Sequence, residues 1–169
     1  MRLKHHCGIW KISIILFAII LAGCQTAGPG VAALSGVMNE DDRIPLRSMG
    51  SGKWNARHVA VSYNYMKDEG VLGMSGLVTF SEKVQYDFTA VKYLHAELIF
   101  ADERGQVIDS RGLLSSGQGG FDPIEFNQKV PIPPQAAFFA FAYSGELQLS
   151  DHVMGSSSGT AIWGYPVNR

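Results

Sequence analysis

Alternating apolar and polar positions begin at residue 59 and continue along most of the remaining chain. In residues 59–65 the odd positions hold Val, Val, Tyr and Tyr, whereas the even positions are small or polar. A period of two is typical of a strand with one buried face. The alternation breaks at the turn-like stretch 67–70 and resumes over residues 72–80. The sequence therefore predicts a β-hairpin, and Gly73 and Gly76 indicate a bulge or a close neighbour in its second strand.

Further strand patterns follow this hairpin. A turn at residues 102–105 leads into a return strand, and the prolines that end residues 124–132 predict an edge strand there. The aromatic run 136–143 indicates a central strand buried on both faces, and residues 160–165 add a last strand. In residues 93–100 one face holds Leu94, Ala96, Leu98 and Phe100, and the other holds Tyr93, His95, Glu97 and Ile99.

About seven strands joined by turns, without an amphipathic helix after residue 57, predict an all-β fold. We expect an antiparallel two-sheet sandwich that is immunoglobulin-like in the loose sense, formed by residues 57–169. The cysteine and tryptophan pattern that marks true immunoglobulin domains is not present in this sequence.

The first 23 residues have a different pattern. Three basic residues precede an apolar run from Ile12 to Ala22 that only Ser13 interrupts. This run is shorter than the ~20 apolar residues that a membrane-spanning helix needs. A basic start, a short apolar run and small residues at its end are typical of a secretory signal peptide. We therefore predict a helical signal peptide over residues 1–23, with a signal anchor and an incidental cysteine as the alternative.

The end of this run, Leu21-Ala22-Gly23-Cys24, resembles the lipobox of bacterial lipoproteins. The resemblance implies that the Cys24 thiol receives a diacylglycerol group, that the signal is cut before Cys24, and that the new amine is acylated. Each buried CH₂ contributes about 0.8 kcal/mol, so two or three chains on Cys24 would hold the protein on a membrane. The residue after Cys24 is Gln25 and not Asp. By resemblance to enterobacterial lipoproteins, this implies sorting to the outer membrane.

Residues 24–56 contain many small residues and few aromatic ones. We expect them to form a flexible tether between the lipid anchor and the domain. Two alternatives remain: a short helix over residues 31–38, and an edge segment docked through Ile44 and Leu46. Cys7 leaves with the signal and Cys24 is taken by lipid, so no disulfide is expected in the mature domain.

A second resemblance lies in the segment Leu98–Val107, which reads LIFADERGQV. It is similar to the F-x-L-Y-D type of bacterial envelope β-sandwich, in which an apolar strand meets an Asp-x-x-Gly turn and a Val-bearing return strand. Ala101 stands where that family has tyrosine. The resemblance covers residues 71–143; it implies the sandwich fold and no activity.

Composition excludes several classes of function. The 14 Lys and Arg residues nearly balance the 15 Asp and Glu residues, so the chain has no basic excess for nucleic acid. All the basic residues of the signal leave with it, and the mature chain is acidic. The aromatic content of 11% also excludes a disordered chain.

Candidate chemical groups are few. Outside the signal the histidines are His58, His95 and His152, and none of them forms a short-spaced pair, so we expect strand or surface histidines and no metal site. Residues 155–159 read GSSSG and match G-x-S-x-G around Ser157. A nucleophile elbow needs a helix after the serine, and the following residues predict a strand, so we expect a loop and no catalytic residue.

Other patterns also lack a matching motif. Residues 117–120 have no Lys-Ser/Thr for a phosphate loop, and the acidic residues around the turn 102–109 do not have calcium-loop spacing. Paired carboxylates for glycoside hydrolysis have no supporting pattern. We therefore expect no cofactor.

Six aromatic side chains are candidates for partial exposure and for contact with glycans or partner proteins: Tyr63, Tyr65, Tyr86, Tyr93, Trp163 and Tyr165. The sequence as a whole predicts a lipid-anchored envelope protein that is not an enzyme and serves as an interaction or structural module. The alternative is a lipoprotein that binds a small ligand or a glycan. In either case the expected partners of the protein are membrane lipid, bound through acylated Cys24, and an envelope protein or glycan.

Overall fold

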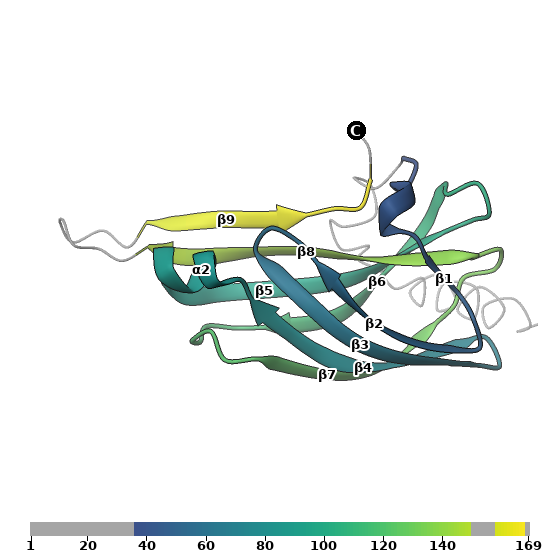
Figure 1. Cartoon of the computed structure of the whole chain (residues 1–169), viewed down its shortest axis with the longest axis horizontal. Helices are drawn as coiled ribbons and strands as arrows, with labels where there is room; N and C mark the ends of the chain where they lie inside the picture. Colours follow the sequence, from purple (N-terminus) through teal and green to yellow (C-terminus); the bar gives the residue numbers. More distant parts are fainter. Residues whose placement is uncertain (1–35, 150–157, 168–169) are drawn as a thin grey trace, which may run out of the picture.

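The computed structural model describes residues 36–149 and 158–167. In this part of the chain it has nine strands, one 3₁₀ helix and one short α-helix (Figure 1). The helices are η2 (Glu40–Asp42) and α2 (Glu82–Asp87). The strands are β1 (Ile44–Pro45), β2 (Met49–Asn55), β3 (Val59–Asp68), β4 (Val71–Phe80), β5 (Phe88–Ala101), β6 (Val107–Ser116), β7 (Ile124–Pro131), β8 (Phe138–Leu149) and β9 (Gly159–Gly164).

The strands form two antiparallel sheets that pack face to face, which confirms the predicted sandwich. One sheet has the order β2-β3-β4-β7. In the other sheet, β5 pairs with one edge of β8, and β6 pairs with β5. On the opposite edge of β8, β1 and β9 pair with successive parts of the strand. Figure 1 shows β9 and β7 on opposite sides of the molecule, with α2 close to the end where β8 leads toward β9.

The strand order supports the immunoglobulin-like description. The neighbours β3-β4-β7 and β9-β8-β5-β6 correspond to strands A-B-E and G-F-C-C′ of an immunoglobulin-type sandwich. Strand β2 extends the first sheet beyond this arrangement by pairing with β3 along seven residues.

The main core lies between the two sheets. The predicted hairpin is confirmed, because β3 pairs with β4 over ten residues and turns Val59, Val61 and Leu72 inward. Tyr63 and Phe141 pack there with ring centroids 5.0 Å apart. Apart from Val84 of α2, the rest of this cluster comes from inward-facing residues of both sheets, as the period of two predicts.

A second, smaller apolar cluster covers the outer face of the five-stranded sheet. It comprises Met38, Ile99, Ala101, Ala140 and Ala142, all at most 1% exposed. The alternate residues of β8 are therefore buried on both faces, which confirms the prediction for the run 136–143. The cover is the segment before η2, which bridges to Val167 near the end of the described chain.

The predicted tether is wrong for its second half. The segment from Gly36 onward belongs to the fold: β1 pairs with β8, and β2 forms the edge of the four-stranded sheet. Ile44 and Leu46 pack against the main core, as the alternative of a docked edge segment predicted. Residues 24–35 lie outside the described part, and so does most of the alternative helix over 31–38.

Helix α2 also differs from the prediction, which contained no helix after residue 57. Ser81 caps it by accepting a hydrogen bond from the backbone N–H of Val84 at 3.4 Å, and Val84 is its buried residue. With six residues it is too short to show an amphipathic period in the sequence. It carries the chain from the four-stranded sheet to β5.

Candidate functional site

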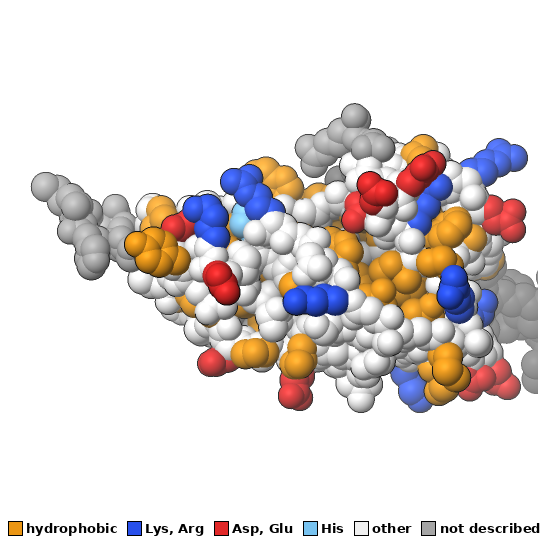
Figure 2. Space-filling model, in the orientation of Figure 1, with side chains coloured by type: hydrophobic (Ala, Val, Ile, Leu, Met, Phe, Trp, Pro, Cys, Tyr) orange, Lys and Arg blue, Asp and Glu red, His pale blue; other side chains and the backbone are white. Residues whose placement is uncertain are grey.

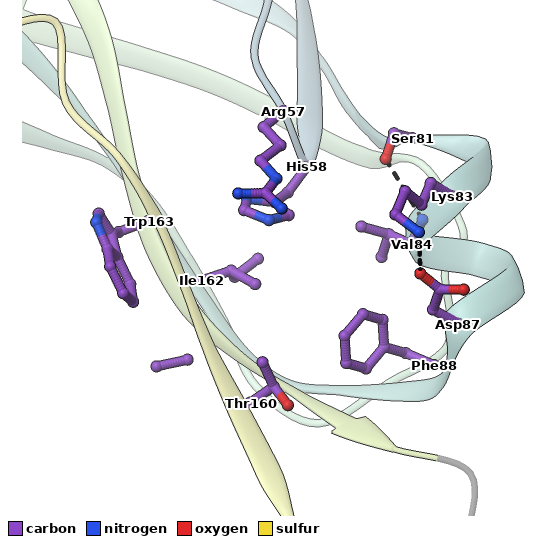
Figure 3. A pocket seen from close by; sticks show the side chains of 11 residues that line it. Arg57, His58, Ser81, Lys83, Val84, Asp87, Phe88, Thr160, Ile162 and Trp163 are labelled. Carbon is purple, nitrogen blue, oxygen red and sulfur yellow. Dashed lines mark hydrogen bonds and ion pairs between the residues drawn. The ribbon is translucent and has the colours of Figure 1, made fainter.

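A pocket lies between α2 and β9, with the loop before β3 on its rim (Figure 3). Its volume is about 360 Å³, which falls within the range of small-molecule sites. Arg57 and His58, the α2 segment and β9 contribute to it, although about a hundred residues separate the first from the last. The fold therefore assembles this site from segments that are distant in the sequence.

The floor of the pocket is apolar. Val84 and Ile162 are each 2% exposed, and Phe88 is half-buried beside them. Figure 3 shows Ile162 pointing into the pocket, whereas Trp163 lies on the other side of β9. Successive residues of a strand point to opposite faces, so Ile162 lies on the pocket floor, whereas Trp163 borders the pocket from the outer side of β9.

The rim carries charge. Lys83 Nζ lies 2.7 Å from Asp87 Oδ2, one turn along α2, and the Lys83 side chain is 76% exposed. An exposed pair of this kind contributes about 0.3–0.5 kcal/mol. Among the described residues Arg57 has no carboxylate partner, so its guanidinium gives this rim a net positive charge.

His58 is held in place by Tyr143 of the facing sheet. The His58 Nδ1 and Tyr143 Oη atoms are 2.7 Å apart, and the two rings meet edge to face. Burial, with a smaller contribution from the charge of Arg57, lowers the pKa of His58 below its ordinary 6.5. Burial also raises the pKa of Tyr143. At neutral pH the rim therefore presents an uncharged imidazole beside a cationic guanidinium.

The polar groups of the pocket include an imidazole, a guanidinium and the Lys83–Asp87 ion pair. The hydroxyl of Ser81 caps α2, and no described hydrogen bond joins it to His58. An apolar floor beneath one guanidinium suits a small molecule with an apolar body and an anionic group.

A second, more open hollow of about 410 Å³ lies along β5 and β6 and includes His95, Glu97 and Gln128. The Oε2 atom of Glu97 is buried here without a hydrogen-bond partner in the described structure. Leaving a carboxylate oxygen in this state costs free energy. The hollow contains no further charged side chain that would complete a site.

The structure does not bring the sequence-predicted groups together. His58 lies beside β3 and His95 lies in β5 of the other sheet; His152 is outside the described residues. Cys24, the lipobox residues Leu21–Gly23 and Gln25 are outside them too. In residues 36–149 and 158–167, no three His, Cys, Asp or Glu side chains gather as metal ligands would.

The G-x-S-x-G match falls mostly outside the described part, including Ser157. Its last residue, Gly159, begins β9, so the segment that follows is the predicted strand. A nucleophile elbow places a helix at this position.

The aromatic candidates divide into two groups. Tyr63 and Tyr65, with 8% and 7% exposure, are core residues whose rings stack 6.3 Å apart. Tyr86, Trp163, Tyr165 and Tyr93 are 91%, 59%, 39% and 38% exposed. These four do not form one patch, since Tyr86 belongs to α2 and Tyr93 to β5.

No helix within the described ranges has the length and apolar character that crossing a membrane requires. Comparison with family models, with curated proteins and with solved structures finds no match to this chain.

Sequence reasoning missed the pocket because Arg57 and Lys83 are ordinary surface residues in the pattern. Only the packing of α2 against β5 and the position of β9 bring their neighbours into one site.

Proposed function

We propose that this protein is a bacterial envelope lipoprotein whose β-sandwich acts as a non-enzymatic interaction or structural module. The observation that carries the proposal is the sequence Leu21-Ala22-Gly23-Cys24 at the end of a short apolar run with a basic start. Acylation of Cys24 would supply the anchor, and Gln25 favours the outer membrane.

The architecture is compatible with this anchor. The described structure begins at Gly36, twelve residues after the acylated Cys24. Twelve residues span at most about 40 Å when fully extended. The module would therefore work close to the membrane, where an envelope protein or a glycan is the expected partner.

Replacement of the anchor residue tests this proposal. We expect Cys24→Ser to abolish incorporation of a palmitate analogue and to leave the signal uncut, because serine has no thiol to form the thioether. Intact-mass measurement and membrane fractionation provide the readout. Cys7→Ser is the matched control and should be processed as the parent is. Lipid labelling of Cys24→Ser, or cleavage of its signal before residue 24, would refute the assignment.

The pocket between α2 and β9 favours a second candidate function, a lipoprotein that binds a small ligand. Its apolar floor of Val84, Phe88 and Ile162 and the guanidinium of Arg57 suit an aromatic or aliphatic carboxylate. Such a protein would carry or sense a small molecule at the membrane surface.

A titration with benzoate, followed by amide resonances, tests this second function. We expect saturable shifts at Val84, Phe88 and Ile162, with affinity reduced about tenfold or more in Arg57→Gln because a charge-assisted hydrogen bond is lost. Arg47→Gln removes an exposed arginine elsewhere and should bind as the parent does. Shifts that are absent, or equal in both variants, would exclude carboxylate binding at this pocket.

A further inference from the structure

The chain enters the fold on the outer face of the five-stranded sheet. The backbone N–H of Met38 donates to Gly105 O at 2.8 Å, and that of Val107 donates to Gly36 O at 3.0 Å. Met38 is fully buried against Ile99 and its neighbours on this face. Gly36 is thus fixed at the turn between β5 and β6, and the preceding residues leave from that position.

The uncovered part of the same face carries exposed aromatic side chains. Ala140 and Ala142 of β8 point outward into the second cluster, so Ser144 and Glu146 point outward as well. Trp163 pairs with Ser144 and is 59% exposed.

Tyr93 on β5 pairs with Glu146 from the other side. Its ring lies 5.3 Å from that of His95, centroid to centroid, and Tyr93 is 38% exposed. Trp163 and Tyr93 therefore flank β8 on one surface, which we call the aromatic face.

The aromatic face also carries charge. Lys92 Nζ lies 2.8 Å from Glu146 Oε1, and about a third of each of these side chains is exposed. Glu97 of β5 lies on the same side, and its Oε2 atom is buried without a hydrogen-bond partner in the described structure. Tryptophan and tyrosine have an apolar body and a polar edge, and they are enriched where protein meets the membrane–water interface. The two exposed aromatic side chains therefore suit the headgroup region of a lipid surface.

The other sheet provides a useful comparison. Its outer face also exposes apolar side chains (Figure 2), with Met49 at 67%, Met66 at 59% and Leu77 at 38%. The chain does not enter the fold on that side, and none of these three side chains is aromatic. Apolar exposure alone therefore does not distinguish the two faces, whereas the entry point of the chain does.

We propose that the aromatic face lies against the phospholipid bilayer, with Trp163 and Tyr93 at the headgroup level. This inference rests on the proposed acylation of Cys24. The twelve residue steps from Cys24 to Gly36 span at most about 40 Å when fully extended, so the face on which Gly36 lies stays near the anchored end. Trp163 lies some six residues along the strands from the entry turn, or roughly 20 Å, which is within the same distance.

Tryptophan quenching by brominated lipid tests the orientation. The full chain is expressed, acylated and purified, then reconstituted in phosphatidylcholine vesicles with or without bromine atoms near the top of the acyl chains. After signal cleavage the tryptophans are Trp54 and Trp163. We expect bromine to quench part of the emission of the parent, and Trp163→Phe to remove that quenched part. Trp163 is exposed, so this variant should keep the fold.

A tryptophan on the opposite face is the matched control. Leu77→Trp in the Trp163→Phe background places a probe on the outer face of β4, where Leu77 is 38% exposed. We expect bromine to leave its emission unchanged. Equal quenching of the probes on both faces would overturn the proposed orientation.

The remaining outcomes separate the two proposals. If the acylated protein stays on the vesicles and Trp163 is not quenched, the orientation is wrong and the lipoprotein assignment stands. A blue-shifted but unquenched Trp163 would show that another protein, such as a second copy, covers the face, and would also overturn the inference. If the purified chain carries no lipid mass, the proposed function itself fails.

Discussion

Gly73 and Gly76 lie three residues apart on β4 and have different neighbours. A Cβ atom added at Gly76 would collide with the backbone oxygen of Ser62 and lie 2.8 Å from Cζ of Phe126. At Gly73 the nearest atom to such a Cβ is the Met66 oxygen at 3.6 Å, an ordinary contact. The sequence indicated a bulge or a close neighbour at these glycines, and the structure gives a close neighbour to Gly76.

We expect Gly76→Ala to lower the free energy of unfolding by about 1–3 kcal/mol, because the added methyl group overpacks the core between β3 and β7. Gly73→Ala is the matched control and should stay within about 1 kcal/mol of the parent, since it chiefly restricts the unfolded chain. Urea denaturation followed by circular dichroism measures both. Equal effects would mean that Gly76 has more room than the structure shows.

The tyrosines of β3 show why exposure was hard to predict at single positions. Tyr63 and Tyr65 belong to the main core because Gly52 and Gly50 of β2 lie against their rings. The alternation placed both tyrosines on the inner face. It did not reveal which strand would cover them, since the covering residues lack side chains.

At the scale of elements, strands with a clear period of two were predicted well, and those without it were not. The hairpin β3–β4 and the strands β7 and β9 appear where the pattern predicts them. Strands β5 and β8 include most of the predicted segments 93–100 and 136–143, but β5 starts five residues earlier and β8 ends six residues later. Strand β2 reads MGSGKWN, in which small residues hide the alternation. An edge strand that packs glycines on aromatic rings has no apolar pattern of its own to detect.

This difference predicts where the folding unit begins. A fragment of residues 36–169 should be rich in strand and should unfold cooperatively. A fragment of residues 57–169 lacks β1, β2 and the buried Met38, so it should aggregate or unfold without cooperativity. Circular dichroism during thermal unfolding compares the two. If the shorter fragment is equally stable, the segment 36–56 adds nothing to the core.

At the scale of the whole molecule, the sandwich was predictable because alternation, turns and the lack of long helices all agree. The candidate site was not, since Arg57 and Ile162 meet only after both sheets have formed and α2 has crossed between them. The outer cluster was equally hidden: Met38 had no periodic neighbours to mark it as a core residue. A pocket or cluster whose residues are distant in the sequence can be located only when the order of all the strands is known.

The joined ends of the described chain have a consequence for biogenesis. Asn39 N–H donates to Pro166 O at 2.8 Å, and β8 needs β9 along its edge, so the first and last segments complete the same sheet. A chain that emerges N-terminus first, from a ribosome or a translocation pore, lacks that partner until residues 159–166 have also emerged. Closure of this sheet therefore waits for a segment more than a hundred residues after Asn39, and the polypeptide remains threadable until then.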